Sequence, residues 1–303
     1  MKTVAVFLLF LAGSWAHMCL ISPHQRGSMA GINKPGSPDC GLTSGPCGQR
    51  PAPPKKATKA FLTGTPQTVT IQKNLDHYNP SSPGEITISF RAGRTGKFTL
   101  LEKIPDNGEP SLTLYSVNIT IPNFTGNLGT RSSRGQLTLP PRKQTMKTVA
   151  VFLMCLAGTW AHMCMISPPQ RGSMMGINKA GADDCALVTG PCGGRMPMPH
   201  TGIALMAGEN FTVTLQKNLD HWTSSSPGMF TINMREGEEG EFKQLAMIKD
   251  MGEPSLTLYS TNITVPHPMG HGMATLQAVY VTKNPQAPAM FYECADVHIM
   301  PRP

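Results

Sequence analysis

The chain has 303 residues, of which 15% are charged and 6% aromatic, and its 30 glycines and 28 prolines are typical of a β-rich, loop-rich protein. This composition excludes helical bundles and coiled coils. The net charge of +8 does not indicate a nucleic-acid-binding protein, because all the basic excess lies in residues 1–145, with 16 basic and 6 acidic side chains, against 10 and 12 in residues 146–303.

The first 16 residues have the features of a signal peptide. A lysine precedes a short apolar stretch, and Ser14 and Ala16 are the small residues at the two positions that signal peptidase reads. We expect cleavage after Ala16, which makes His17 the new amino terminus. The sequence therefore predicts a secreted, extracellular protein with no stable membrane insertion after cleavage.

Residues 17–145 and 162–303 are two copies of one sequence unit, here called the first and second repeats. The segment that starts at Met146 repeats the opening of the chain almost letter for letter, so residues 146–161 form a second signal-like segment that ends at Ala161. The similarity stops after residue 122, where the first repeat runs into a polar, basic tail, and the first repeat is therefore expected to be truncated. We hypothesise that two tandem gene copies were joined into one chain; the alternative is a genuine two-domain precursor.

The second repeat opens with a Gly/Pro-rich stretch and continues with about seven short runs rich in β-branched and aromatic residues. Turn sequences separate the runs. This spacing predicts an all-β fold, an immunoglobulin-like antiparallel β-sandwich with a long amino-terminal loop region. The predicted strands cover residues 211–216, 229–234, 242–248, 255–260, 262–265, 273–282 and 290–299.

Cysteines and sequons agree with an oxidising secretory pathway. An even set of four cysteines in the second repeat predicts two disulfides, in one of three possible pairings, that tie the opening loop to the sandwich. The first repeat keeps an odd number. The four cysteines are Cys164, Cys185, Cys192 and Cys294. Predicted glycosylation sites are Asn118, Asn123, Asn210 and Asn262.

Cleavage after Ala161 would leave His162 as an amino-terminal histidine, whose α-amine and ring nitrogen can chelate one metal ion. Cu(II) favours such tetragonal nitrogen sites. A third nitrogen is expected from His221, which follows a predicted strand, and His17 and His77 stand at the same positions in the first repeat. Copper is therefore the predicted cofactor.

The chain resembles the lytic polysaccharide monooxygenase-like copper-acquisition proteins, a secreted histidine-brace family. The resemblance lies in the cut before a histidine, the HMCxISPxQRG opening, the NLDH motif after a strand, and a terminal Cys-Ala-Asp-Val, and it covers residues 162–299. It implies an immunoglobulin-like sandwich that holds copper with His162, His221 and Asp296. Asp220 is the alternative third ligand, although neighbouring strand residues point to opposite faces.

The expected function is extracellular copper(II) binding for acquisition, delivery or sequestration. The first alternative is a copper-dependent lytic polysaccharide monooxygenase, so whether the protein is an enzyme stays open. Few aromatic side chains are available to stack on sugar rings, and a carboxylate on the metal would hinder oxygen chemistry. A metal-free adhesion or structural domain is the second alternative. The expected partners are the copper ion and either a copper transporter or an extracellular carbohydrate.

Overall fold

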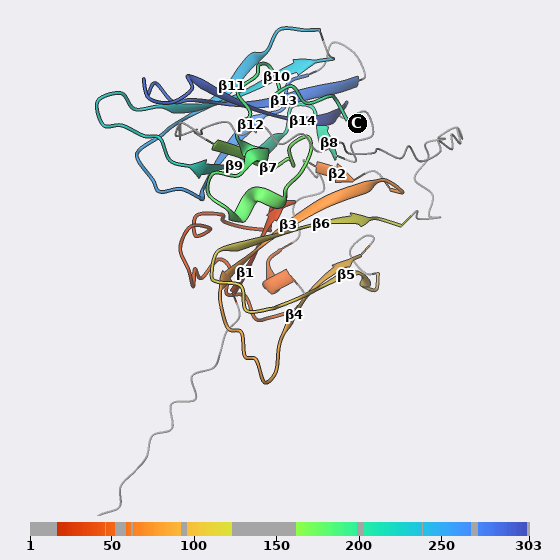
Figure 1. Ribbon diagram of the computed structural model, residues 1–303. Helices are drawn as coiled ribbons and strands as arrows, with labels where there is room; N and C mark the ends of the chain where they lie inside the picture. The colour runs from red at the N-terminus through yellow and green to blue at the C-terminus, as the bar shows by residue number, and fades with distance from the viewer. Residues whose placement is uncertain are drawn as a thin grey trace, which may run out of the picture.

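The structure of the protein is a computed structural model (Figure 1). It describes residues 17–45, 47–51, 59–61, 63–91, 96–122, 162–198, 203–237, 239–267 and 272–301. The strands of the first repeat are β1 (His17–Ser22), β2 (Lys59–Phe61), β3 (Pro66–Leu75), β4 (Glu85–Phe90), β5 (Thr99–Pro105) and β6 (Thr113–Thr120). Those of the second are β7 (His162–Ser167), β8 (Ile203–Met206), β9 (Asn210–Leu219), β10 (Met229–Glu236), β11 (Lys243–Lys249), β12 (Thr257–Thr264), β13 (Gly272–Val281) and β14 (Met290–Met300).

Helical structure in these described ranges is limited to three 3-10 turns, η1 (Cys47–Gln49), η2 (Met175–Asn178) and η3 (Asp183–Cys185). No helix that the structure describes has the length and apolar character needed to span a membrane. The prediction of an all-β sandwich is confirmed.

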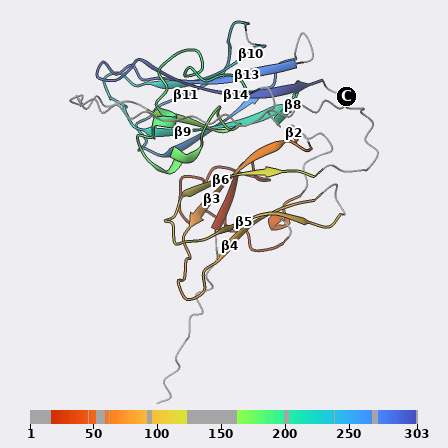
Figure 2. The same ribbon diagram turned by 45° about the vertical axis from the view of Figure 1, so that its right-hand side comes forward.

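The second repeat packs two sheets face to face (Figure 2). One sheet has the order β11-β10-β13-β14-β8 and the other β12-β9-β7. Alternate residues of β10 and β13 point inward, as the period-two pattern predicts, and Phe230 stacks on Tyr280 with ring centroids 4.4 Å apart. Every residue of the apolar cluster between these sheets belongs to the second repeat.

The structure differs from the predicted strands in two details. The predicted strands at 255–260 and 262–265 form the single strand β12. The opening stretch, for which no strand is predicted, contains the two short strands β7 and β8. All six residues of β7 are buried, so the strand lacks the alternation of apolar and polar residues by which a half-buried strand is recognised.

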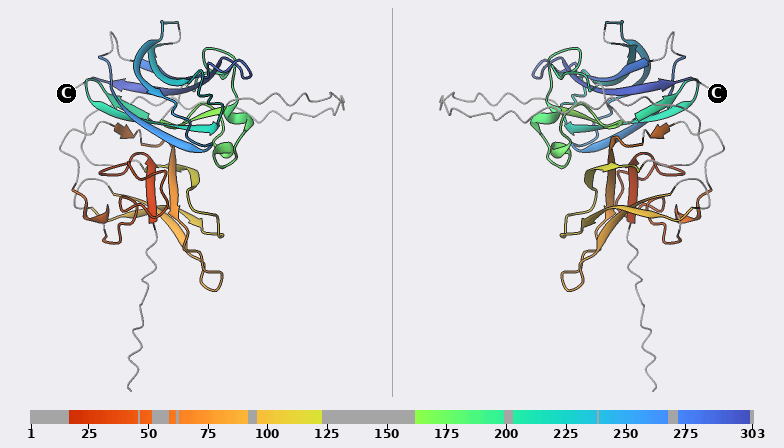
Figure 3. Two further views of the ribbon diagram at one scale, coloured as in Figure 1. Left: turned by 90° about the vertical axis from the view of Figure 1, so that its left-hand side faces the viewer. Right: turned by 90° about the vertical axis from the view of Figure 1, so that its right-hand side faces the viewer.

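The first repeat has the same strand order where it has the strands. β1-β3-β6 matches β7-β9-β12, and the hairpin β4-β5 matches β10-β11. Strand β2 instead joins the sheet of the second repeat by pairing with β8, so that the two repeats meet along a shared sheet, as the two views of Figure 3 show.

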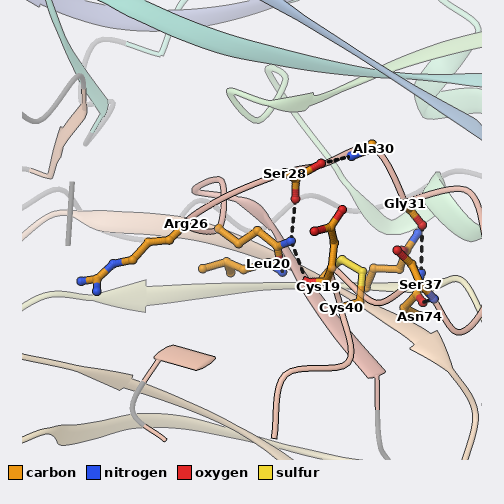
Figure 4. Close-up of a disulfide and its surroundings, with 12 residues drawn as sticks. Cys19, Leu20, Arg26, Ser28, Ala30, Gly31, Ser37, Cys40 and Asn74 are labelled. Carbon is orange, nitrogen blue, oxygen red and sulfur yellow. Dashed lines mark hydrogen bonds between the residues drawn. A yellow bond between two sulfur atoms is a disulfide. The ribbon is translucent and has the colours of Figure 1, made fainter. Parts of the chain in front are cut away.

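In the part of the chain that the structure describes, three disulfides fix the loop regions. The second repeat contains Cys164–Cys185 and Cys192–Cys294, which selects one of the three possible pairings. In the first repeat Cys19 pairs with Cys40, and the Cys47 thiol is free and exposed, in agreement with the odd number of cysteines there. Beside the Cys19–Cys40 bond, the side chain of Asn74 holds the loop by accepting from the Ser37 backbone N–H at 2.9 Å (Figure 4).

Candidate metal centre

His162 and His221 are brought together by the pairing of β7 with β9. His162 is the first residue of β7 and pairs with Leu219, the last residue of β9, so His221 follows only two residues beyond this pair. Both histidines are more than nine-tenths buried. The structure therefore positions the two predicted nitrogen ligands at one end of a rigid antiparallel ladder.

The first repeat repeats this arrangement, and there the ring geometry is explicit. His17 pairs with Leu75, two residues before His77. The two imidazole rings stack with centroids 5.9 Å apart and an interplanar angle of 22°. The Nδ1 atom of His17 is buried and has no hydrogen-bond partner in the described part of the chain. A buried ring nitrogen without a partner is the condition in which a metal ion would be accommodated.

Phe291 of β14 contacts the centre, although it was not predicted from the sequence. Its fully buried ring stacks against the ring of His162 at a centroid distance of 6.3 Å and an interplanar angle of 30°. Residues 291, 295, 297 and 299 share the inward face of β14 and enter the core. The period-two pattern of this strand, counted from its buried apolar residues, could have placed Phe291 on that face.

A buried network of charged side chains lies beneath the segment that carries His221. Lys217, wholly buried on β9, donates to Asp250 at 2.7 Å and to Asp220 at 2.9 Å. Tyr280 donates to the other oxygen of Asp250 at 2.5 Å. Burial and the hydrogen bond to Asp250 both raise the pKa of Tyr280, so the phenol stays protonated and acts as a donor.

Two further hydrogen bonds fix the backbone on either side of His221. Asp220 accepts from the backbone N–H of Trp222 at 3.0 Å, and the side chain of Asn284 donates to the backbone carbonyl of His221 at 3.0 Å. These contacts, together with the Lys217 network, restrict the position of the imidazole before any metal binds.

Asp296 is not brought to the histidines. Arg171 donates to its carboxylate from Nε at 2.8 Å and from Nη2 at 2.5 Å, and the backbone N–H of Met198 donates to it at 2.7 Å. Asp296 lies five residues from Phe291 on one strand, which is about 16 Å along the chain and on the opposite face. The carboxylate of Asp296 neutralises a buried arginine, and the structure does not bring it to the two histidines.

Asp220, the alternative ligand, is occupied by Lys217 and by the Trp222 backbone. Among the described residues, no group of three or more His, Cys, Asp or Glu side chains could hold a metal ion. A brace made of two histidine rings and one α-amine is not such a group, since only two of its ligands are side chains.

The predicted glycosylation sites remain predictions. Asn118, Asn210 and Asn262 are exposed on strands, whereas Asn123 lies outside the described residues. Each of the first three shares a hydrogen bond with a threonine across the ladder.

Comparisons with known proteins give no family. No family model matches the sequence, and no curated protein matches it. A lytic polysaccharide monooxygenase from Jonesia denitrificans is 16% identical with a TM-score of 0.31, over 46% of this chain and 100% of that one. A chitin binding domain from Burkholderia pseudomallei is 13% identical with a TM-score of 0.27, over the same shares. ScLPMO10B in complex with zinc is 18% identical with a TM-score of 0.23, and the match covers 31% of this chain and 50% of the length of that structure. Likenesses this low carry no argument about function.

Proposed function

We propose that residues 162–303 act as a secreted copper(II)-binding protein that acquires, delivers or sequesters extracellular copper. The observation that supports this proposal most strongly is the β7–β9 register, which sets His162 beside the segment that bears His221. The same register recurs in the first repeat, where the two rings stack. The chemistry of the donors, imidazole and amine nitrogen, suits Cu(II) among the divalent first-row ions.

The proposed ligands are the α-amine and ring of His162 and the ring of His221. Removal of residues 146–161 is required, because the nitrogen of His162 is an amide until the Ala161–His162 bond is cut. Since the ordinary pKa of a free α-amine is about 8, this group loses its proton to a bound metal near neutral pH. Bound copper would supply a Lewis-acidic, redox-active centre. Phe291 would shield it on one side and exclude water there.

Copper binding without turnover is favoured over polysaccharide oxidation because few aromatic side chains on the described surface of the second repeat are available to stack on sugar rings. Trp222, 36% exposed, is the single large aromatic side chain of the second repeat, among the residues described, that counts as exposed. A copper-dependent monooxygenase stays the second candidate for one reason. With Asp296 bound to Arg171, the predicted carboxylate ligand would not stand in the way of oxygen at the metal, and Phe291 lies against His162 instead.

The test compares residues 162–303 beginning at His162 with the same protein carrying one additional Ala before it. Cu(II) binding is measured by isothermal titration and electron paramagnetic resonance. We expect a nitrogen-rich axial spectrum, and affinity at least 100-fold weaker after the extension and in His221→Ala. His267→Ala is the matched control. His267 is exposed and follows the end of β12 that pairs with Asn210, at the opposite end of β9 from Leu219.

Equal affinity in all four proteins would refute the brace, and no binding in any of them would favour a metal-free adhesion or structural domain. Addition of a reductant and chitin or cellulose separates the two copper functions. Oxidised oligosaccharides would establish the monooxygenase. Tight binding without such products would support the carrier, whose partner is then sought among copper transporters.

A further inference from the structure

The two repeats meet about an approximate twofold axis, and the pairing of β2 with β8 shows this directly. Ala60 pairs with Ala204, flanked by Lys59 with Leu205 and Phe61 with Ile203. In the alignment of the two repeats Ala204 is the counterpart of Ala60, 144 residues away. An antiparallel pair centred on two equivalent residues is a strand paired with its own counterpart, which is the relation that a twofold axis generates.

A second set of contacts obeys the same axis. Asn33 of the first repeat donates from Nδ2 to the carbonyl of Leu258 at 2.8 Å and accepts from its N–H at 2.9 Å. The counterpart Asn178 does the same to Leu114, with distances of 2.7 and 2.8 Å. Each asparagine thus satisfies both backbone groups of one residue in the other repeat, and the two clasps are reciprocal.

The space between the clasps is apolar and is made of equivalent residues from both sides. Ile32 and Ile177 are buried there with Leu114 and Leu258. A cavity of about 350 Å³ lies beside them, lined by the same segments of both repeats. This face, defined by Ile177, Asn178, Leu258 and β8, is called the twofold face below.

We propose that the second repeat, once released as residues 162–303, forms a symmetric dimer with a second copy of itself through the twofold face. A twofold interface needs both halves of every contact on one molecule. The second repeat carries both, since Asn178 and Leu258 are its own, and β8 can pair with β8 of the partner about Ala204. The pairing also covers the open edge of β8, which would otherwise be free to pair with other chains.

His24 makes two contacts across the repeats that the proposed dimer would lack. It bonds to Thr214 at 2.9 Å, and its ring lies edge-on to the ring of Phe211 with centroids 6.2 Å apart. The counterpart of His24 in the second repeat is Pro169, which has neither a donor nor an aromatic ring. The dimer would keep both clasps. The proposal does not depend on copper.

The second repeat is expected to fold alone, because its apolar core and both of its disulfides are internal to it. Sedimentation velocity of unglycosylated residues 162–303 across a concentration series measures the dimer. Glycans are left out because Asn262 lines a cavity at this surface. Asn178→Asp removes the donor and sets a carboxylate against the Leu258 carbonyl in both clasps, and we expect the dimer dissociation constant to rise about 100-fold.

Gln244→Glu makes the same chemical change on exposed β11, and it should leave the dimer intact. Ile177→Ser gives a second, uncharged disruption, and near-ultraviolet circular dichroism confirms folding of each variant. The intact chain of residues 17–303, in which the first repeat covers the face, should stay monomeric. A monomeric 162–303 at all concentrations, or a dimer that neither Asn178→Asp nor Ile177→Ser weakens, would overturn the proposal.

Discussion

Replacing Lys217 by methionine tests the buried charge network that supports the His221 segment. Met keeps the length of the side chain and removes its charge, which leaves the Asp250 carboxylate with the Tyr280 hydroxyl and the Gly252 backbone N–H as donors. At the observed 2.7 Å, the attraction between Lys217 and Asp250 is about 6 kcal/mol for an effective dielectric constant of about 20. Desolvation of the two groups offsets part of it, and removal of one partner is expected to cost about 3–5 kcal/mol.

Urea unfolding of residues 162–303 at pH 7, followed by tryptophan fluorescence, measures this loss as a change in the free energy of unfolding. Lys249→Met is the control, since Lys249 is exposed on β11, and its change should stay within about 0.5 kcal/mol. The double variant Lys217→Met/Asp250→Asn should recover much of the loss, because no buried charge is then uncompensated. A loss below about 1 kcal/mol in Lys217→Met would refute the reasoning.

Three other changes give expected outcomes. Burial opposes ionisation of Glu253, but hydrogen bonds from Tyr259 and a backbone N–H lower its pKa on balance. Glu253→Gln should therefore cost about 1 kcal/mol of unfolding free energy at pH 7. Thermal unfolding against pH should show this deficit shrink as the pH falls below about 4.5. Burial raises the pKa of Glu293, whose carboxyl oxygens have no partner among the described residues. The folded protein favours the protonated carboxyl, so stability should fall as the pH rises above about 4.5. The melting temperature of Glu293→Gln should therefore exceed that of the parent at pH 8 and equal it at pH 4. Replacing Cys192 and Cys294, which are 102 residues apart, by alanine should cost about 4.7 kcal/mol in urea unfolding, from the loop-closure entropy of the unfolded chain.

The sequence predicted the sandwich and the histidine pair because both depend on local patterns. The alternation in β10 and β13 survives in the packed core, and a histidine after a predicted signal-peptidase site is visible in the sequence itself. Strand β7 was missed because burial on both sides removes alternation. Asp296 was predicted from the family resemblance, which takes no account of the period of β14. That period separates the face of Asp296, which binds Arg171, from the face of Phe291.

Other features could not be predicted, because they depend on which segments meet in space. Lys217 occupies a strand position where a lysine would normally face solvent, and only the approach of Asp250 and Tyr280 makes its burial tolerable. Asn178 lies in a short turn with no sequence pattern that distinguishes it from an ordinary loop residue. Its role emerges when Leu114 of the other repeat is placed opposite.

The two repeats differ at the twofold face and at the proposed metal centre. The first repeat has the clasp residue Asn33 and the stacked pair His17 and His77, so it can serve as a partner and supply two imidazoles. In its described residues no strand corresponds to β14, and nothing there takes the part of Phe291 against the amino-terminal ring. If shielding by Phe291 sets the affinity of the centre, a Phe291→Ala variant of the second repeat should bind Cu(II) as weakly as the first repeat does. Equal affinity of the variant and its parent would place the whole of the binding energy in the histidines.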